Sequence, residues 1–229
     1  MTAGSAPDSR PWGMMGFFEF VQDRWPVLSF LAYQHMSVVV QSLIIATAVG
    51  LLLAVLAYRS SAGAAAGNAL SAVGLTLPSY ALLGLLIAFI SSGVVVSVIA
   101  LAFYGCLPIL RNAIVGLRGV DAKLVESARG MGMSRLKILL RLEIPLAWPV
   151  IMTGVRVSGQ MMMGVAAITA YVLGPGLGGY IFAGISRMGG ANATNSIVAG
   201  TIGILILAVI LDAALNILTR ITTSRGIRV

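Results

Sequence analysis

The sequence is poor in charged residues. Only 10% of its 229 residues are charged and 59% are hydrophobic, whereas a typical soluble domain is about one-quarter charged. Because a folded soluble protein keeps much of its surface in water, fifteen Lys and Arg with seven Asp and Glu are too few to cover one. The composition excludes an ordinary water-soluble domain and predicts a single all-α bundle in a lipid bilayer.

Cysteine, histidine and lysine are also scarce, which limits the possible chemistry. Cys106 is the single cysteine, so no disulfide can form within the chain, and we expect it to fill a small core space. His35 is the single histidine; it precedes the first apolar run, where we expect an interfacial hydrogen bond and no metal site. Neither lysine, Lys123 or Lys137, is followed by the Ser or Thr of a P-loop. We therefore expect no catalytic group, metal, ATP or other cofactor bound by this chain.

Five apolar runs approach the 20 or so helical residues that cross a bilayer. They cover residues 37–58, 66–90, 94–110, 148–171 and 197–218. Before them, residues 14–30 mix aromatic and charged side chains, which predicts a short interfacial helix broken at Pro26 rather than a loose apolar tail. No cleavable signal peptide is evident at the N-terminus.

The basic residues indicate the orientation. With the N-terminus outside, eleven of the fifteen Lys and Arg fall in cytoplasmic segments: Arg59, Arg111, Arg118, Lys123, Arg129, Arg135, Lys137, Arg141, Arg220, Arg225 and Arg228. Positive residues favour the cytoplasmic side, so this distribution predicts an N-out, C-in topology. It also accounts for the net charge of +8 without nucleic-acid binding. The chain then divides into an extracytoplasmic or interfacial segment (1–36), a transmembrane domain (37–218) and a cytoplasmic tail (219–229).

The longest predicted cytoplasmic loop covers residues 119–147. Loops of this length are usually functional, and its apolar spacing predicts two amphipathic helices, 121–131 and 134–142. Glycines between them suit a tight turn, Ser134 can cap the second helix, and Pro145 is expected to end it. Composition alone leaves two roles open, a passive shelf in the headgroups or a docking site for a cytoplasmic partner.

A spaced motif in this loop resembles a known one. Glu126-Ser127-Ala128 is followed after three residues by Gly132 and, after nine more, by Leu142-Glu143-Ile144-Pro145. The pattern is similar to the EAA loop of ABC importer permeases, E-A-A, three residues, G, nine residues, I-x-L-P, with conservative departures at Ser127, Leu142 and Ile144. The resemblance implies a type I permease fold whose loop forms a coupling helix seated in a separate ATPase. It assigns the ATPase-coupling role to Glu126, Ser127, Ala128, Gly132, Leu142 and Pro145.

Further stretches narrow the resemblance to the osmoprotectant permeases, the glycine betaine, choline and carnitine importers. They are residues 77–83, 107–112, 126–133 and 173–178; Pro175 departs from the small residue usual there. This resemblance implies import by alternating access, a cytoplasmic ATPase dimer that binds ATP and Mg, a second permease copy or a similar permease, and an extracytoplasmic binding protein. Two alternatives stay open: a permease for methionine, a sulfonate or another small solute, and a non-transporting membrane scaffold.

Polar residues inside the predicted spans are costly in lipid and often functional. Arg156 and Asp212 lie at similar depths below the inner surface, which predicts an intramembrane ion pair, with a substrate contact as the alternative. Six further residues are candidates for a polar translocation path: Pro78, Ser79, Tyr80, Ser158, Gln160 and Thr169. The sequence does not reveal the aromatic cage that a quaternary amine would favour.

Overall fold

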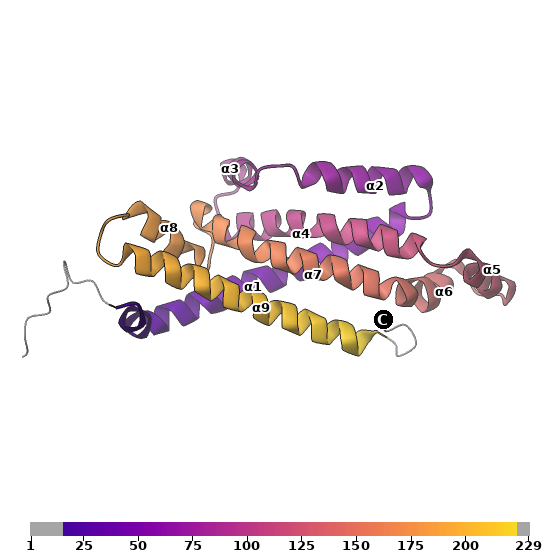
Figure 1. Ribbon diagram of the computed structural model, residues 1–229. Helices are drawn as coiled ribbons and strands as arrows, with labels where there is room; N and C mark the ends of the chain where they lie inside the picture. Colours follow the sequence, from indigo (N-terminus) through magenta and orange to yellow (C-terminus); the bar gives the residue numbers. More distant parts are fainter. Residues whose placement is uncertain (1–15, 224–229) are drawn as a thin grey trace, which may run out of the picture.

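The computed structural model describes residues 16–223, which form an elongated bundle of helices without a strand in that range (Figure 1). The helices are α1 (Phe17–Ala57), α2 (Ser61–Gly74), α3 (Ser79–Phe89), α4 (Gly93–Arg118), α5 (Ala122–Gly130), α6 (Arg135–Ile138), the π-helical η2 (Leu139–Glu143), α7 (Ile144–Ile168), the 3₁₀ turn η3 (Thr169–Val172), α8 (Gly178–Ser186) and α9 (Ala193–Thr222). The predicted all-α membrane bundle is confirmed.

Four stretches of the described chain are long and apolar enough to cross a membrane: Phe17–Ala57, Gly93–Arg118, Arg135–Val172 and Ala193–Thr222. A fifth forms if α2 and α3, which are bent by 92° at their junction, count as one span. Pro78 is the N-cap residue of α3, so the proline predicted inside the second span stands at the bend.

Helix α4 forms the centre of the bundle and packs against α1 and α7. In its most apolar 18-residue window 61% of the residues are buried, against 17% for α9, so α9 is peripheral. A Cβ added at Gly154 of α7 would lie 2.8 Å from the Cβ of Asn112 and 3.0 Å from the carbonyl oxygen of Pro108. Glycine therefore lets the backbones of α4 and α7 approach closely, as small residues do in membranes.

Helix α1 differs from its prediction. It begins at Phe17, twenty residues before the predicted span, and continues through Pro26 without a break. The first turns are seen end-on in Figure 1 while the rest runs across the view, so the helix bends near its start; proline bends a helix by removing a hydrogen bond. The 41 residues span about 60 Å, twice the hydrocarbon thickness, so one end extends past it. Residues 1–15 and 224–229 of the predicted terminal segments lie outside the described range.

The helix leading into α7 also differs from its prediction. Pro145 does not end a helix, because α6 continues through η2 into α7, and Pro145 stands in the first turn of α7. Within a continuous helix proline removes one backbone hydrogen bond, and the irregular π-helical turn η2 lies directly before α7. The second half of the predicted loop, from Arg135 onward, and the fourth span are therefore one continuous helical stretch.

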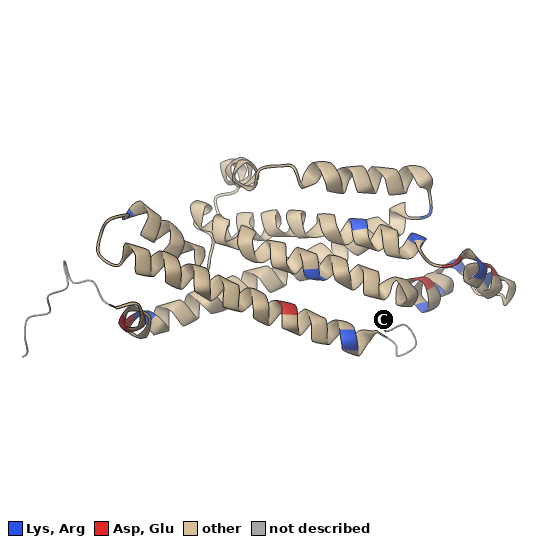
Figure 2. Ribbon diagram, in the orientation of Figure 1, with Lys and Arg blue, Asp and Glu red and all other residues tan. Residues whose placement is uncertain are grey.

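Charged residues gather at one end of the bundle (Figure 2). This end carries α5 and α6, the turn between α1 and α2, and the end of α9 (Figure 1). The start of α1 and the connection from α8 to α9 lie at the opposite end. The loop that resembles the EAA loop thus occupies the more highly charged end.

Candidate functional site

Helix α5 presents the first part of the EAA-like motif. Asp121 caps it by accepting a hydrogen bond from the amide of Lys123 at 2.9 Å. Glu126 and Ser127 are exposed, whereas Ala128 is only 4% exposed. The motif therefore offers its carboxylate outward while its small residue packs inward.

The turn after α5 is a Schellman motif. The amide of Met133 donates to the carbonyl of Ala128 at 3.1 Å, and the amide of Gly132 donates to the carbonyl of Arg129 at 3.0 Å. Gly132 has φ +79°, the left-handed conformation that this motif requires just past a helix end. The glycine of the motif is thus explained by backbone conformation.

The second part of the motif lies where α6 becomes α7. Ser134 caps α6 through a 3.4 Å hydrogen bond from the amide of Lys137, as predicted. Leu142 is half-buried in η2, and Pro145 is exposed in the first turn of α7. A single-turn π-helix often marks a functional site, and here it joins the loop to a membrane span.

A polar cluster that the sequence did not reveal ties this junction to α1. The Tyr58 hydroxyl donates to Oε2 of Glu143 at 2.8 Å, and Arg59 lies beside both, with Nε 2.6 Å from the Tyr58 hydroxyl oxygen and Nη2 3.5 Å from Oε2 of Glu143. Glu143 is 6% exposed. Burial raises the pKa of Tyr58, and the hydrogen bond to Tyr58 raises the pKa of Arg59. Both side chains therefore stay protonated at neutral pH and remain hydrogen-bond donors to Glu143. Residues 85 positions apart gave no local signal of this contact.

A basic pocket of about 340 Å³ adjoins the cluster. It is lined by Arg59, Val125, Arg129, Arg135, Ile138 and Glu143. Three arginines and one carboxylate thus line a single pocket beside the EAA-like motif.

The predicted pair of Arg156 and Asp212 is in contact between α7 and α9. Arg156 donates from Nε to Oδ1 at 3.1 Å and from Nη2 to both carboxylate oxygens at 2.9 and 3.1 Å. Gln160, a path candidate, donates to the same Oδ1 at 2.9 Å. Gln160 therefore contacts the ion pair, although the sequence suggested a place on the translocation path for Gln160 and a separate role for the pair.

The other path candidates are divided. Ser158 and Thr169 are fully buried, and their hydroxyls donate to the backbone carbonyls of Gly105 and Ala166. Both side chains lie between packed segments, which does not support a place on an open translocation path. Pro78 and Tyr80 are exposed and Ser79 is half-buried at the start of α3.

Three aromatic rings meet at the end of the bundle opposite the coupling loop. Tyr80 packs edge-on against Tyr171 with ring centroids 5.5 Å apart, and Tyr171 lies 6.5 Å from Phe182. The rings come from α3, η3 and α8. A sequence pattern could not group them because they are distant along the chain.

His35 is not interfacial, contrary to the prediction. It lies inside α1, is fully buried, and its Nε2 is 3.2 Å from the carbonyl oxygen of Met163. Since α1 begins earlier than predicted, residue 35 falls within the packed bundle. Cys106 is buried and fills core space as predicted.

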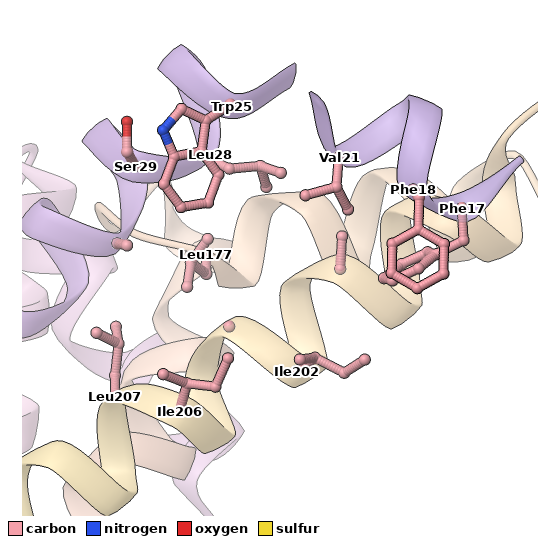
Figure 3. A pocket seen from close by; sticks show the side chains of 13 residues that line it. Phe17, Phe18, Val21, Trp25, Leu28, Ser29, Leu177, Ile202, Ile206 and Leu207 are labelled. Carbon is pink, nitrogen blue, oxygen red and sulfur yellow. The ribbon is translucent and has the colours of Figure 1, made fainter. Parts of the chain in front are cut away.

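An apolar groove of about 400 Å³ runs between α1 and α9 (Figure 3). Phe18, Trp25 and Leu28 of α1 face Ile202 and Ile206 of α9 across it. Its lining is almost entirely hydrocarbon and suits lipid tails or another apolar surface, with no chemistry of its own.

The arrangement is that of a membrane bundle with a charged helical loop at one end, and comparisons with known proteins identify its family. A family described as "Binding-protein-dependent transport system inner membrane component" matches residues 46–223. The chain belongs to this family. As a binding-protein-dependent permease it is a multi-pass inner-membrane subunit of an ABC importer and not itself an enzyme, and membership implies a partner ATPase and a substrate-binding protein.

Several curated permeases are similar over most of their length. The choline transport system permease protein OpuBB of Bacillus subtilis is 35% identical over 92% of this chain and 95% of its own. The osmoprotectant import permease protein OsmW of Salmonella typhimurium is 35% identical over 93% and 100%. The glycine betaine/carnitine/choline permease protein OpuCB of Bacillus subtilis is 34% identical over 91% and 94%. The resemblance to osmoprotectant permeases seen in the sequence is thereby confirmed.

Solved structures share the fold. A permease chain from inward-facing conformations of the MetNI methionine ABC transporter matches with a TM-score of 0.75 and 18% identity, covering 89% of this chain and 99% of that one. A chain of an amino acid ABC transporter crystallised with histidines matches with a TM-score of 0.70 and 19% identity over 90% and 99%. At these identities the likeness establishes the type I permease fold alone.

Proposed function

We propose that this permease imports a small osmoprotectant, glycine betaine, choline, carnitine or a similar quaternary amine, by alternating access. The observation that carries the proposal is the 34–35% identity, over more than nine-tenths of both chains, to permeases named for choline, glycine betaine and carnitine. Methionine is a weaker candidate because the MetNI likeness, at 18% identity, extends only to the fold.

The proposed energy input is a cytoplasmic ATPase dimer that binds ATP and Mg and seats the coupling loop of this chain. Large apolar side chains of this loop stay exposed in the isolated chain: Leu124, Met131, Leu136 and Leu140, between 47% and 76%. Exposed apolar side chains that gather on one surface often mark contacts with a partner. The exposed carboxylate of Glu126 adds a polar contact on the same loop.

The proposed assembly contains a second copy of this permease or a similar one, and an extracytoplasmic binding protein delivers the solute. The N-terminus is proposed to be outside and the C-terminus inside. Support comes from the charged end of the bundle, where the coupling loop, the α1–α2 turn and the end of α9 lie together, because positive residues favour the cytoplasmic side.

The cargo is tested by uptake. A strain lacking its own osmoprotectant importers would express this permease with the ATPase and binding protein encoded beside it, and would receive labelled glycine betaine, choline, carnitine, methionine or taurine. We expect uptake of at least one quaternary amine and of neither methionine nor taurine. Uptake of methionine or taurine alone would replace the proposed cargo, and absence of any uptake by an assembled complex would favour a scaffold.

The coupling role is tested with Glu126→Lys in the same complex. Because Glu126 is exposed, the variant should assemble with normal thermal stability. Stimulation of ATP turnover by loaded binding protein should fall together with uptake. Normal stimulated turnover and uptake would contradict the proposed contact.

A further inference from the structure

The ion pair of Arg156 and Asp212 lies at the surface of the isolated bundle. The two side chains are 35% and 30% exposed, and Gln160 beside them is exposed. Thr153, Gln160 and Gly164 are exposed on α7 at spacings of seven and four residues, which places them on one helix face. We call Thr153, Arg156, Gln160 and Gly164 the polar stripe.

The face of α9 that points away from Asp212 has the opposite character. Its exposed side chains, at spacings of four and seven residues, include Ile206, Ile210, Ile217 and Ile221, between 53% and 72% exposed. Such a face suits lipid tails. An ion pair about one-third exposed and the exposed amide of Gln160 would be costly to place in contact with hydrocarbon. Intramembrane charges normally face a bundle interior or a water-filled cavity, so the polar stripe faces a hydrated space in the assembled importer.

Hydrogen-bonding capacity is left over at the pair. Arg156 uses Nε and Nη2 on Asp212, and its Nη1 has no hydrogen-bond partner among residues 16–223. Oδ1 of Asp212 accepts three hydrogen bonds and Oδ2 accepts one. A carboxylate oxygen has about two acceptor sites. Oδ2 of Asp212 can therefore still bind a positively charged group, and Nη1 of Arg156 can still bind a negatively charged one.

We propose that the polar stripe lines the translocation path and that Arg156 and Asp212 form a subsite for a zwitterionic solute. The assignment of the solute rests on the proposed function. The carboxylate of a betaine accepts hydrogen bonds from Nη1, a charge-assisted contact. Its quaternary ammonium has no N–H and is held near Oδ2 by Coulomb attraction alone. Choline, which lacks a carboxylate, makes only the second contact.

The first test asks whether the stripe is hydrated. In a chain with Cys106→Ala, the Val157→Cys and Ile210→Cys variants would be assembled with ATPase and binding protein in vesicles. A charged, membrane-impermeant methanethiosulfonate would be added during ATP turnover. Val157 lies next to Arg156 and is 46% exposed, whereas Ile210, on the apolar face of α9, is 53% exposed.

Exposure in the isolated chain alone would favour slightly faster labelling at Ile210. We expect the reverse, with Val157→Cys labelled at least about tenfold faster, because reaction requires a hydrated thiolate. Labelling of Val157→Cys no faster than that of Ile210→Cys would overturn the placement on the path.

The second test asks whether the pair selects zwitterions. The double variant Arg156→Gln with Asp212→Asn removes both charges without leaving one unpaired, and its uptake of glycine betaine and of choline is expressed relative to wild type. The matched control is Asp23→Asn with Arg24→Gln, which removes a 3.0 Å ion pair whose side chains are 52% and 55% exposed.

We expect the retained fraction of betaine uptake to be lower than that of choline by about tenfold, the effect of losing one hydrogen bond to a charged group. If wild type carries no choline, the comparison is betaine uptake against the control variant. Equal retention in an assembled double variant overturns the subsite while leaving the proposed function intact. If the double variant does not assemble, the labelling result decides. If wild type carries no quaternary amine at all, the proposed function fails first.

Discussion

Replacing Gly132 with alanine tests whether the coupling loop depends on its Schellman turn. A Cβ at Gly132 would meet nothing within 4 Å, so the substitution introduces no steric clash in the isolated chain. The backbone conformation, φ +79°, is the only source of cost. A non-glycine residue pays about 1–2 kcal/mol in this left-handed region, which lowers the population of the native turn by roughly 5–30-fold relative to alternatives.

Gly130, two residues earlier, is the matched control. A Cβ there also meets nothing within 4 Å, but Gly130 is the last residue of α5 and is not among the described residues with positive φ. Alanine is favoured over glycine in a helix by about 1 kcal/mol, so Gly130→Ala should leave the turn intact. The two variants add the same methyl group and differ only in the backbone conformation that receives it.

The assay is titration of the ATPase subunit against the permease in proteoliposomes, with stimulated ATP turnover as the readout. If docking needs the native turn, the half-saturating ATPase concentration rises as the populated fraction of that turn falls, by up to roughly 5–30-fold for Gly132→Ala, and stays unchanged for Gly130→Ala. Identical titration curves for the two variants would refute the argument that the glycine is required for its positive φ.

Three other outcomes follow from the structure. Tyr58→Phe removes the hydroxyl that donates to Glu143 and should lower the stability of the purified complex by about 1.5–3 kcal/mol, whereas Tyr33→Phe, at a side chain 70% exposed, should not. Since burial raises the pKa of Tyr58, the difference in melting temperature should hold up to the ordinary tyrosine pKa and shrink only at more alkaline pH. Equal melting temperatures of the two variants would contradict this prediction. Asp212→Asn leaves Arg156 charged within the membrane and should reduce recovery of assembled complex more than exchanging the two residues does; full recovery and uptake with Asp212→Asn would show that the pair is dispensable. A reporter after Val229 should be cytoplasmic and one at Gly189 extracytoplasmic, and a Gly189 site reached only from the cytoplasm would reverse the topology.

The sequence predicted those features that depend on local pattern. Apolar runs and charge placement gave the all-α membrane bundle, and the spacing from Glu126 to Pro145 pointed to the coupling loop and the family. The cap at Ser134 and the turn at Gly132 were also predictable, since each depends on residues within one helical turn. Arg156 and Asp212 could be paired because lone charges are disfavoured in lipid.

Tertiary contacts explain what the sequence did not predict. Pro26 and Pro145 suggested helix ends, but α1 continues through Pro26, and the π-helical η2 leads directly into α7 at Pro145. His35 and Ser158 looked available for polar roles, yet each is buried against a backbone carbonyl of another helix. The contact of Tyr58 with Glu143 and the ring group around Tyr171 join distant segments, and no periodicity encodes such pairs.

The continuous helical stretch from Arg135 to Val172 has a mechanical consequence. Its 38 residues measure about 57 Å, and Gly154, where the α4 backbone approaches closely, is at the middle of that length. A rod held at its midpoint acts as a lever with two equal arms. A tilt of roughly 5° about Gly154 would move each end by about 2.5 Å in opposite directions, by the geometry of arms about 28 Å long. A push on the loop would thus reach Tyr171 and its neighbouring rings as a displacement of similar size and reversed direction, without any unfolding of the helix between them.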